Sequence, residues 1–307
     1  MKNLTLTGLA VMSLLAQGAA QARPDPQQPM VAHVLKQTGT GYAFQTRTLD
    51  SADGQRHYRL YIGRPDHDAP ATGYPVVYLL DGNAAVGALD RALLQQVDSG
   101  EAPPVIVAIG STSPLRIDRT ARTFDYTPKL RTGPQLDGSN GLPSGGADDF
   151  LDLLELHIKP LVEQALPVDR QRQMLWGHSY GGLLVLHALC TRPDSFQTYV
   201  AASPSLWWGD AAVKAEVTRL PAHLEQRSAR LLLMRGDAES GGPGAQAPPQ
   251  NEPGAAMDRL LSQLQGVPGL HTRYRIFPGL GHGPMLSASL TYALLHGFEE
   301  DIAPTSP

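Results

Sequence analysis

The chain has 307 residues, of which 42% are hydrophobic and 18% charged, and its formal net charge at pH 7 is -4. A chain of this length can form one large α/β domain with a substantial core. The small negative charge, without a basic tract, argues against nucleic-acid binding. The single cysteine, Cys190, excludes an intrachain disulfide and is expected to be a small buried residue.

The first 22 residues have the features of a signal peptide. Lys2 supplies a positive charge, residues 4–15 are mostly apolar but too few to cross a bilayer, and Ala20-Gln21-Ala22 matches the A-x-A cleavage pattern. An anchor helix that is never cut is the alternative, but the small residues at the end of the segment argue against it. We therefore expect a periplasmic protein with no membrane span after cleavage and one mature domain at residues 23–307.

The N-terminal part of this domain is expected to form one edge of a sheet. Residues 42–49 and 57–63 alternate between apolar and polar side chains, which is typical of antiparallel strands with one solvent-facing side. Residues 74–80 form a continuous apolar run, which predicts a central parallel strand that is buried on both faces. This strand ends in Asp81-Gly82-Asn83, so these residues are expected at the carboxyl edge of the sheet.

A basic segment follows the next predicted helix (89–97) and buried strand (105–109). Residues 111–147 have little regular pattern, and a segment this long inside a compact domain is usually functional or disordered. Beside Phe124 and Tyr126 it carries five basic residues: Arg116, Arg119, Arg122, Lys129 and Arg131. A basic, aromatic segment near an active site would suit an anionic substrate, whereas a solvated surface loop is the simpler alternative.

The rest of the chain alternates between helical and strand patterns. Apolar residues recur at every third or fourth position in residues 148–166, which predicts an amphipathic helix with a kink at Pro160. Residues 240–254 form a low-complexity loop. Further strands are expected at 174–176, 198–202, 230–236 and 272–276, and further helices at 183–189, 210–220, 257–264 and 287–301. The alternation predicts a mostly parallel, doubly wound sheet flanked by helices.

The strand at residues 174–176 leads into Gly177-His178-Ser179-Tyr180-Gly181, which fits the G-x-S-x-G pattern. Gly177 and Gly181 remove the side chains that would crowd a direct turn from strand to helix. Ser179 would lie on that turn at a helix N-terminus, where unpaired N–H groups favour a developing negative charge. This context predicts a nucleophile elbow, and a glycine-rich turn that contains a serine by chance is the alternative.

A base and an acid are expected at the ends of later strands. His282 follows the last strand, and with an acid after the strand at 230–236 it gives the chain order Ser…Asp/Glu…His of α/β-hydrolases. His282 would accept the proton of Ser179 and return one to the leaving alkoxide. Glu239 is the favoured acid because it lies further into the loop, Asp237 is the second candidate, and Asp258 lies a little beyond. A Ser–His dyad without a close acid is also open.

Backbone and aromatic groups complete the predicted site. The N–H of Tyr180 and the N–H of Asn83 are expected to form the oxyanion hole. Trp207 and Trp208 follow the strand at 198–202 and would serve either as core packing or as an aromatic wall of a pocket. The sequence has no H-E-x-x-H motif, paired cysteines or clustered histidines, so no metal or other cofactor is expected.

Several of these stretches resemble the esterase D-type branch of the α/β-hydrolases, and within it the periplasmic trilactone siderophore esterases. The matching stretches are residues 74–82, 122–128, 177–182, 203–208 and 279–282, which extend over nearly all of the mature chain. Many hydrolases share the elbow. Asp-Tyr-Thr-Pro at 125–128 and Ser-Pro-Ser-Leu-Trp-Trp at 203–208 are more specific to this branch.

The resemblance implies hydrolysis of the serine trilactone of ferric enterobactin, which releases iron from a catecholate siderophore. It carries over Ser179 as nucleophile and His282 as base, whereas members of this branch vary in their acid. Arg119 and Arg122 match the region that is expected to meet the anionic ferric catecholate. A bulky, anionic tris-catecholate would suit an open site with arginines and aromatic walls.

Three other functions are compatible with the sequence. An exported carboxylesterase for another ester, such as an acetyl or feruloyl sugar, would not need the basic segment. An acyltransferase on the same scaffold would give a transfer product when an acceptor alcohol is supplied. A catalytically silent siderophore-binding protein is the third, and the presence of both Ser179 and His282 argues against it.

Overall fold

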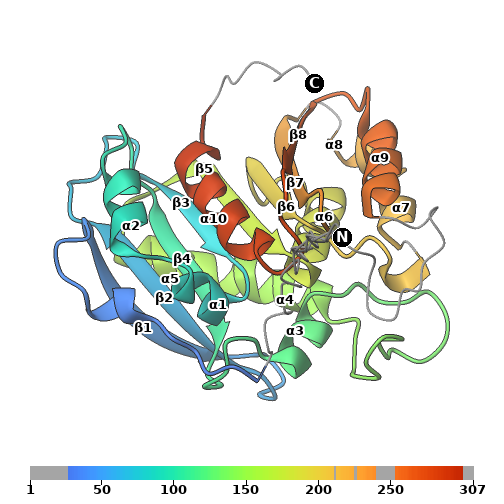
Figure 1. Cartoon of the computed structure of the whole chain (residues 1–307), viewed down its shortest axis with the longest axis horizontal. Helices are drawn as coiled ribbons and strands as arrows, with labels where there is room; N and C mark the ends of the chain where they lie inside the picture. Colours follow the sequence, from blue (N-terminus) through green and yellow to red (C-terminus); the bar gives the residue numbers. More distant parts are fainter. Residues whose placement is uncertain (1–26, 211, 225–226, 240–252, 300–307) are drawn as a thin grey trace, which may run out of the picture.

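An eight-stranded mixed sheet crosses the molecule (Figure 1). The computed structural model describes residues 27–210, 212–224, 227–239 and 253–299. The expected signal peptide and most of the low-complexity loop lie outside these residues. The strands are β1 (Tyr42–Asp50), β2 (His57–Pro65), β3 (Tyr74–Leu79), β4 (Val105–Ser111), β5 (Val168–His178), β6 (Thr198–Ala202), β7 (Ala229–Gly236) and β8 (Leu270–Phe277).

The strand order is β1-β2-β4-β3-β5-β6-β7-β8. Strand β2 pairs antiparallel with both β1 and β4, and every later neighbouring pair is parallel. The sequence-based prediction of an α/β-hydrolase fold with antiparallel N-terminal edge strands is therefore confirmed. Parallel pairing brings the carboxyl ends of β3, β5, β6, β7 and β8 to one edge of the sheet, where the predicted site residues follow.

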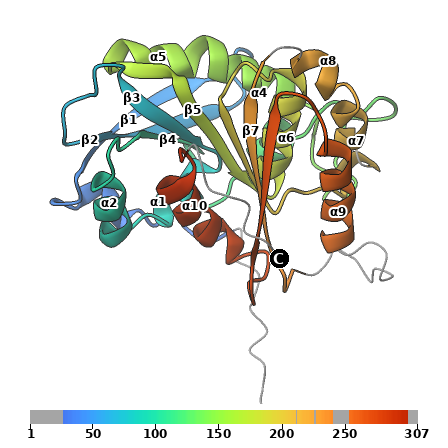
Figure 2. The same cartoon turned by 90° about the horizontal axis from the view of Figure 1, so that it is seen from above.

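Helices cover both faces of the sheet (Figure 2). Along β3, Val76, Tyr78 and Leu80 belong to one apolar core, and Val77 and Leu79 belong to the other. One core is closed by α4 (Ala147–Leu153), α5 (Lys159–Ala165), α6 (Tyr180–Thr191), α7 (Ala212–Val217), α8 (Leu220–Leu224) and α9 (Pro253–Leu264). The other is closed by the 3-10 turn His33–Lys36 with α1 (Gly82–Gly87), α2 (Arg91–Asp98) and α10 (Met285–His296). None of the described helices has the length and apolar character that crossing a membrane requires.

Two helices near the predicted site differ from the sequence-based expectation. Helix α1 begins directly after β3, and α3 (Arg119–Asp125) lies inside the segment that was expected to be irregular. Both are too short to show a full apolar period in sequence, and α3 is defined by a cap, because Asp118 Oδ1 accepts the N–H of Ala121 at 3.0 Å. The amino end of α1 therefore lies where the chain leaves β3, whereas α3 begins further along the segment that follows β4.

The kink expected at Pro160 takes the form of a π-helical turn. Residues Leu154–Ile158 form this turn between α4 and α5, and Pro160 follows it at the start of α5. Proline has no N–H to donate to the preceding turn and its ring crowds the carbonyl there, which a wider turn relieves. The expected helix at 210–220 is divided into α7 and α8, and the last helix ends at His296.

A buried histidine joins three helices on the α6 side of the sheet. His187 Nδ1 lies 2.9 Å from Glu216 Oε1 and its Nε2 lies 3.2 Å from Asp148 Oδ1, while Arg192 lies 3.8 Å from the same Asp148 oxygen. Burial lowers the pKa of His187, but the hydrogen bonds and charges of the two carboxylates outweigh it and raise that pKa to about 9. The imidazolium is therefore the form that links α4, α6 and α7.

This pair of contacts predicts a pH-dependent stability. Because the folded-state pKa is raised from 6.5 to about 9, protonated His187 stabilises the fold by up to about 3 kcal/mol below pH 6.5, and this is lost as pH rises through 9. We expect urea unfolding at pH 6, 8 and 10 to show this loss in the wild type and not in His187→Gln. A free-energy difference between the two proteins that stays constant from pH 6 to pH 10 would contradict it.

Candidate active site

Ser179 lies on a strained turn between β5 and α6. Its backbone has φ 62 and ψ -116, a region that a non-glycine residue occupies at a cost of about 1–3 kcal/mol. A Cβ on Gly177 would lie 2.4 Å from the backbone of Gly181, so only glycine fits there. The Ser179 N–H donates to the carbonyl of Ala202 at the end of β6, at 3.0 Å. This is the local geometry of a nucleophile elbow.

His282 and Glu239 form a pair at the carboxyl edge of the sheet. His282 Nδ1 lies 3.2 Å from Glu239 Oε2. The imidazole side chain is 46% exposed, whereas the carboxylate is only 4% exposed. With Nδ1–H donating to Glu239, the Nε2 of His282 keeps the lone pair that a general base needs.

Two further donors hold the Glu239 carboxylate. Glu239 Oε1 accepts Ser203 Oγ–H at 2.6 Å and the N–H of Gly236 at 2.7 Å, which leaves Oε2 for His282. Burial raises the pKa of Glu239, but these hydrogen bonds outweigh it, so the pKa lies below its usual range. Glu239 is therefore ionised at neutral pH and oriented toward the imidazole.

Asp237, the second candidate acid, has a different role in the structure. Its Oδ1 accepts the N–H of Gly279 at 2.6 Å, which joins the end of β7 to the loop that carries His282. Among the hydrogen bonds of the described residues, none joins Asp237 to the His282 ring. The geometry therefore favours Glu239, as the sequence-based interpretation did, and assigns Asp237 to loop attachment.

His178 contacts the loop that carries His282. Its Nε2–H donates to the His282 carbonyl at 2.9 Å, and the two rings lie with centroids 4.6 Å apart. Burial, followed by the charges of His282 and Arg122, lowers the pKa of His178 well below its usual range. His178 is therefore neutral at neutral pH and places no charge of its own beside the His282 ring.

The Ser179 hydroxyl is not joined to His282 by a hydrogen bond in this structure. Its Oγ lies 3.3 Å from the Oγ of buried Ser205, whose N–H also donates to the Ser179 carbonyl at 3.2 Å. Catalytic hydrogen bonds are often long without substrate and shorten when the substrate binds. In this structure the Ser179 hydroxyl therefore contacts Ser205 and not His282.

Backbone donors without an acceptor lie at both predicted halves of the oxyanion hole. Tyr180 is the first residue of α6, and Gly82 and Asn83 are the first two residues of α1. Among the described hydrogen bonds, none is donated by the N–H of these three residues. The Asn83 side chain is fully engaged elsewhere, with Tyr61 Oη–H and with the carbonyls of Ser113 and Leu115, so only its N–H could serve an oxyanion.

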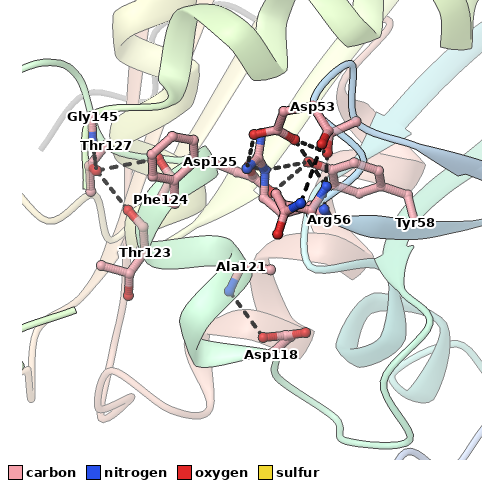
Figure 3. A network of polar contacts seen from close by, with 12 residues as sticks. Asp53, Arg56, Tyr58, Asp118, Ala121, Thr123, Phe124, Asp125, Thr127 and Gly145 are labelled. Carbon is pink, nitrogen blue, oxygen red and sulfur yellow. Dashed lines mark hydrogen bonds and ion pairs between the residues drawn. The ribbon is translucent and has the colours of Figure 1, made fainter. Parts of the chain in front are cut away.

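The basic segment is anchored to the β1–β2 hairpin (Figure 3). Arg56, which precedes β2, contacts Asp125 at the end of α3 at 2.9 Å, and Tyr58 Oη–H donates to the same carboxylate at 3.0 Å. Burial, opposed by Arg56 and Tyr58, raises the pKa of Asp125 to about 7. Beyond the helix, Thr127 Oγ1–H donates to Thr123, and Gly145 donates to Thr127 Oγ1. Helix α3 therefore presents its arginines from a fixed position.

The two arginines predicted to bind substrate differ in their surroundings. Arg119 is exposed, and the described residues offer it no ion pair or hydrogen bond. Arg122 Nε and Nη2 instead donate to the two oxygens of Asp81, at 2.9 and 3.0 Å. Burial lowers the pKa of Arg122, but the adjacent Asp81 carboxylate raises it, and the resulting pKa lies above its usual range. A substrate contact stays a prediction for Arg119 only.

The two adjacent tryptophans also differ in their exposure and contacts. Trp207 is 43% exposed and lies 5.8 Å from the Tyr180 ring, between centroids. Trp208 is 3% exposed and donates its indole N–H to Asp137 Oδ2 at 2.8 Å, and Tyr180 Oη–H donates to the same oxygen at 2.6 Å. Trp208 therefore anchors the segment after α3, and only Trp207 could form an aromatic wall.

Three polar residues of this region were not predicted from the sequence. Ser203 orients Glu239, Ser205 contacts Ser179, and Asp137 ties the segment after α3 to Tyr180 and Trp208. The positions of Ser203 and Ser205 directly after a strand that ends beside the elbow could have suggested the first two. Asp137 offered no such signal, because it lies in an irregular segment.

Comparisons with known proteins agree with this geometry. The Esterase family model, described as "Putative esterase", matches residues 51–295. The apo-salmochelin esterase of Escherichia coli O6:H1 is 39% identical over 295 residues, covering 94% of this chain and 89% of that protein. The ferri-bacillibactin esterase BesA of Bacillus subtilis is 31% identical over 279 residues, covering 86% of this chain and 94% of that protein.

Solved structures give the same relationship. The enterobactin hydrolase IroE in complex with DFP superposes with a TM-score of 0.69 at 39% identity, covering 84% of this chain and 96% of that one. The BES protein from Bacillus cereus superposes with a TM-score of 0.71 at 27% identity, covering 82% of this chain and 93% of that one. The resemblance inferred from the sequence motifs is confirmed. The chain belongs to the Esterase family and is a carboxylic ester hydrolase with the α/β-hydrolase fold.

Proposed function

We propose that the chain is an exported serine esterase that hydrolyses the trilactone of ferric enterobactin-type catecholate siderophores and so releases their iron. The observation that carries the siderophore-ester class is the 39% identity, over 94% of this chain, to a protein named as an apo-salmochelin esterase. The iron-loaded form of the substrate is proposed from the resemblance of the sequence motifs. Exposed Arg119 on the anchored helix α3 supports an anionic substrate. The signal-peptide features of the first 22 residues support export to the periplasm.

The chemistry is proposed to begin at Ser179. Its Oγ attacks a lactone carbonyl carbon while His282 Nε2 takes the hydroxyl proton and Glu239 stabilises the imidazolium. The carbonyl electron pair moves to oxygen, where the N–H groups of Asn83 and Tyr180 would stabilise the oxyanion.

Collapse of this intermediate breaks the C–O bond of the lactone. The alkoxide of the substrate's serine leaves and takes the proton from His282 to become a hydroxyl, and the acyl group stays on Ser179. Water, deprotonated by His282, attacks the acyl carbon and restores the Ser179 hydroxyl, so that each turnover adds one water and opens one ester bond.

The substrate class is tested by comparing specificity constants. We expect kcat/KM for ferric enterobactin to exceed that for neutral acetyl and feruloyl esters by at least about 100-fold, because only the siderophore uses the basic helix. Equal or higher values for the neutral esters would favour a general carboxylesterase. Formation of a transfer product with an added acceptor alcohol, in place of hydrolysis, would favour an acyltransferase.

Arg119 is proposed to contact the anionic part of the substrate. Its replacement in Arg119→Gln is expected to raise KM for ferric enterobactin about 10- to 150-fold with little change in kcat, since a charge-assisted contact of this kind contributes about 1.5–3 kcal/mol. The same substitution at exposed Arg47 on β1 is the matched control. An unchanged KM in Arg119→Gln would contradict the assignment.

A further inference from the structure

Arg122 lies between the two loops that supply the proposed oxyanion hole. Its guanidinium makes a bidentate contact with Asp81, in the turn after β3. It lies 5.0 Å from the centroid of the Tyr180 ring, and its Nη2 lies 3.5 Å from the His178 carbonyl at the end of β5. One side chain of α3 therefore contacts both the turn that ends in Asn83 and the elbow that ends in Tyr180.

The turn after β3 needs such a support because Asp81 has a left-handed backbone. With φ 50 and ψ 48, Asp81 is one of three described non-glycine residues with positive φ, together with Ser179 and Ser203. It precedes α1 without capping it by its side chain, since the carboxylate is turned toward Arg122 instead. The Asp81 N–H donates to Tyr126 Oη at 3.0 Å. Arg122 therefore fixes the carboxylate of Asp81, and Tyr126, the residue after α3, fixes its backbone.

The same contacts make Arg122 a poor ligand for a bulky anion. The side chains of Arg122 and Asp81 are only 15% and 6% exposed. Both line a small pocket between β2, β4 and α3. An external anion that captured Arg122 would leave the Asp81 carboxylate buried without its partner, which is strongly unfavourable.

We propose that Arg122 is a positioning residue that holds the turn after β3 against the elbow, so that the N–H groups of Asn83 and Tyr180 converge on one oxyanion. This inference rests on the Ser179 mechanism proposed above and does not depend on the siderophore substrate. It separates the two arginines of α3, since Arg119 would meet the substrate and Arg122 would support the site.

A neutral ester distinguishes positioning from anion binding. In Arg122→Gln we expect kcat for p-nitrophenyl acetate to fall about 10- to 100-fold with KM unchanged, because a displaced oxyanion donor weakens the transition state and not the ground state. Arg122→Lys keeps the charge but contacts one carboxylate oxygen at a time, so it is expected to recover part of the lost kcat.

Arg170→Gln is the matched control. It removes an ion pair with Glu163 near the start of β5, at the opposite end of the strand from Ser179, and is expected to leave kcat within about twofold of wild type. Thermal unfolding of each variant separates loss of activity from loss of fold. If Arg122→Gln fails to fold, the positioning role is tested by the kcat of Arg122→Lys, which should then lie below that of the wild type.

A kcat for p-nitrophenyl acetate within about twofold of wild type in the folded Arg122 variants, with a raised KM for ferric enterobactin, would overturn the proposal and make Arg122 a substrate ligand. A wild-type enzyme that cleaves the neutral ester but not ferric enterobactin would contradict the proposed substrate. The ester kcat of the Arg122 variants would still decide the positioning role.

Discussion

Replacement of His282 by alanine is expected to lower kcat for p-nitrophenyl acetate by about 10⁴- to 10⁶-fold, with KM changed little. The imidazole is the only described base that lies next to a buried carboxylate at the elbow edge of the sheet, and without it the Ser179 hydroxyl stays protonated and unreactive. Steady-state kinetics with single-turnover controls measures the loss directly.

His57 provides the matched control for this loss. It lies on β2 with its Nδ1 2.7 Å from Asp50, so it is also an exposed histidine beside a carboxylate, but β4 and β3 separate β2 from the elbow strand β5 in the sheet. His57→Ala is expected to keep kcat within about twofold of wild type. A His282→Ala enzyme with more than about a tenth of wild-type kcat would show that another group is the base.

Replacement of Glu239 by glutamine is expected to lower kcat by about 10³-fold, because the substitution keeps the size of the side chain but removes the charge that fixes and stabilises the imidazolium. The amide can also donate, so Ser203 Oγ–H and His282 Nδ1–H no longer face two acceptor oxygens. The pH dependence of kcat/KM should change along with kcat, since the base loses its charged partner.

Asp237→Asn tests the alternative acid on the same scale. An asparagine oxygen can still accept the N–H of Gly279, so this variant is expected to stay within about threefold of wild type. A large loss in Asp237→Asn together with near wild-type kcat in Glu239→Gln would assign the acid to Asp237. Near wild-type kcat in both variants would instead leave a Ser–His dyad.

The fold, and the positions of Ser179 and His282 at the carboxyl edge of the sheet, were predictable from the sequence. The apolar run of β3 and the G-x-S-x-G turn after β5 each specify one conformation by sequence alone. His282 is identified by its place after the last strand, where parallel strands bring their carboxyl ends together.

Roles that depend on long-range contacts could not be predicted in this way. Trp207 and Trp208 are neighbours in sequence, but the structure exposes one and buries the other against Asp137, 71 positions earlier. Arg119 and Arg122 lie on one short helix, and only the second meets Asp81, 41 positions away. Composition indicates that basic and aromatic groups are present, whereas tertiary packing decides which of them faces the substrate.

The most direct test of the proposed function is mass spectrometry of ferric enterobactin after incubation with the mature protein, beside Ser179→Ala. We expect the wild type to convert the cyclic trilactone to linear dihydroxybenzoylserine products and Ser179→Ala to convert none. An unchanged trilactone, in a sample that still cleaves p-nitrophenyl acetate, would contradict the proposed siderophore esterase while leaving the hydrolase in place.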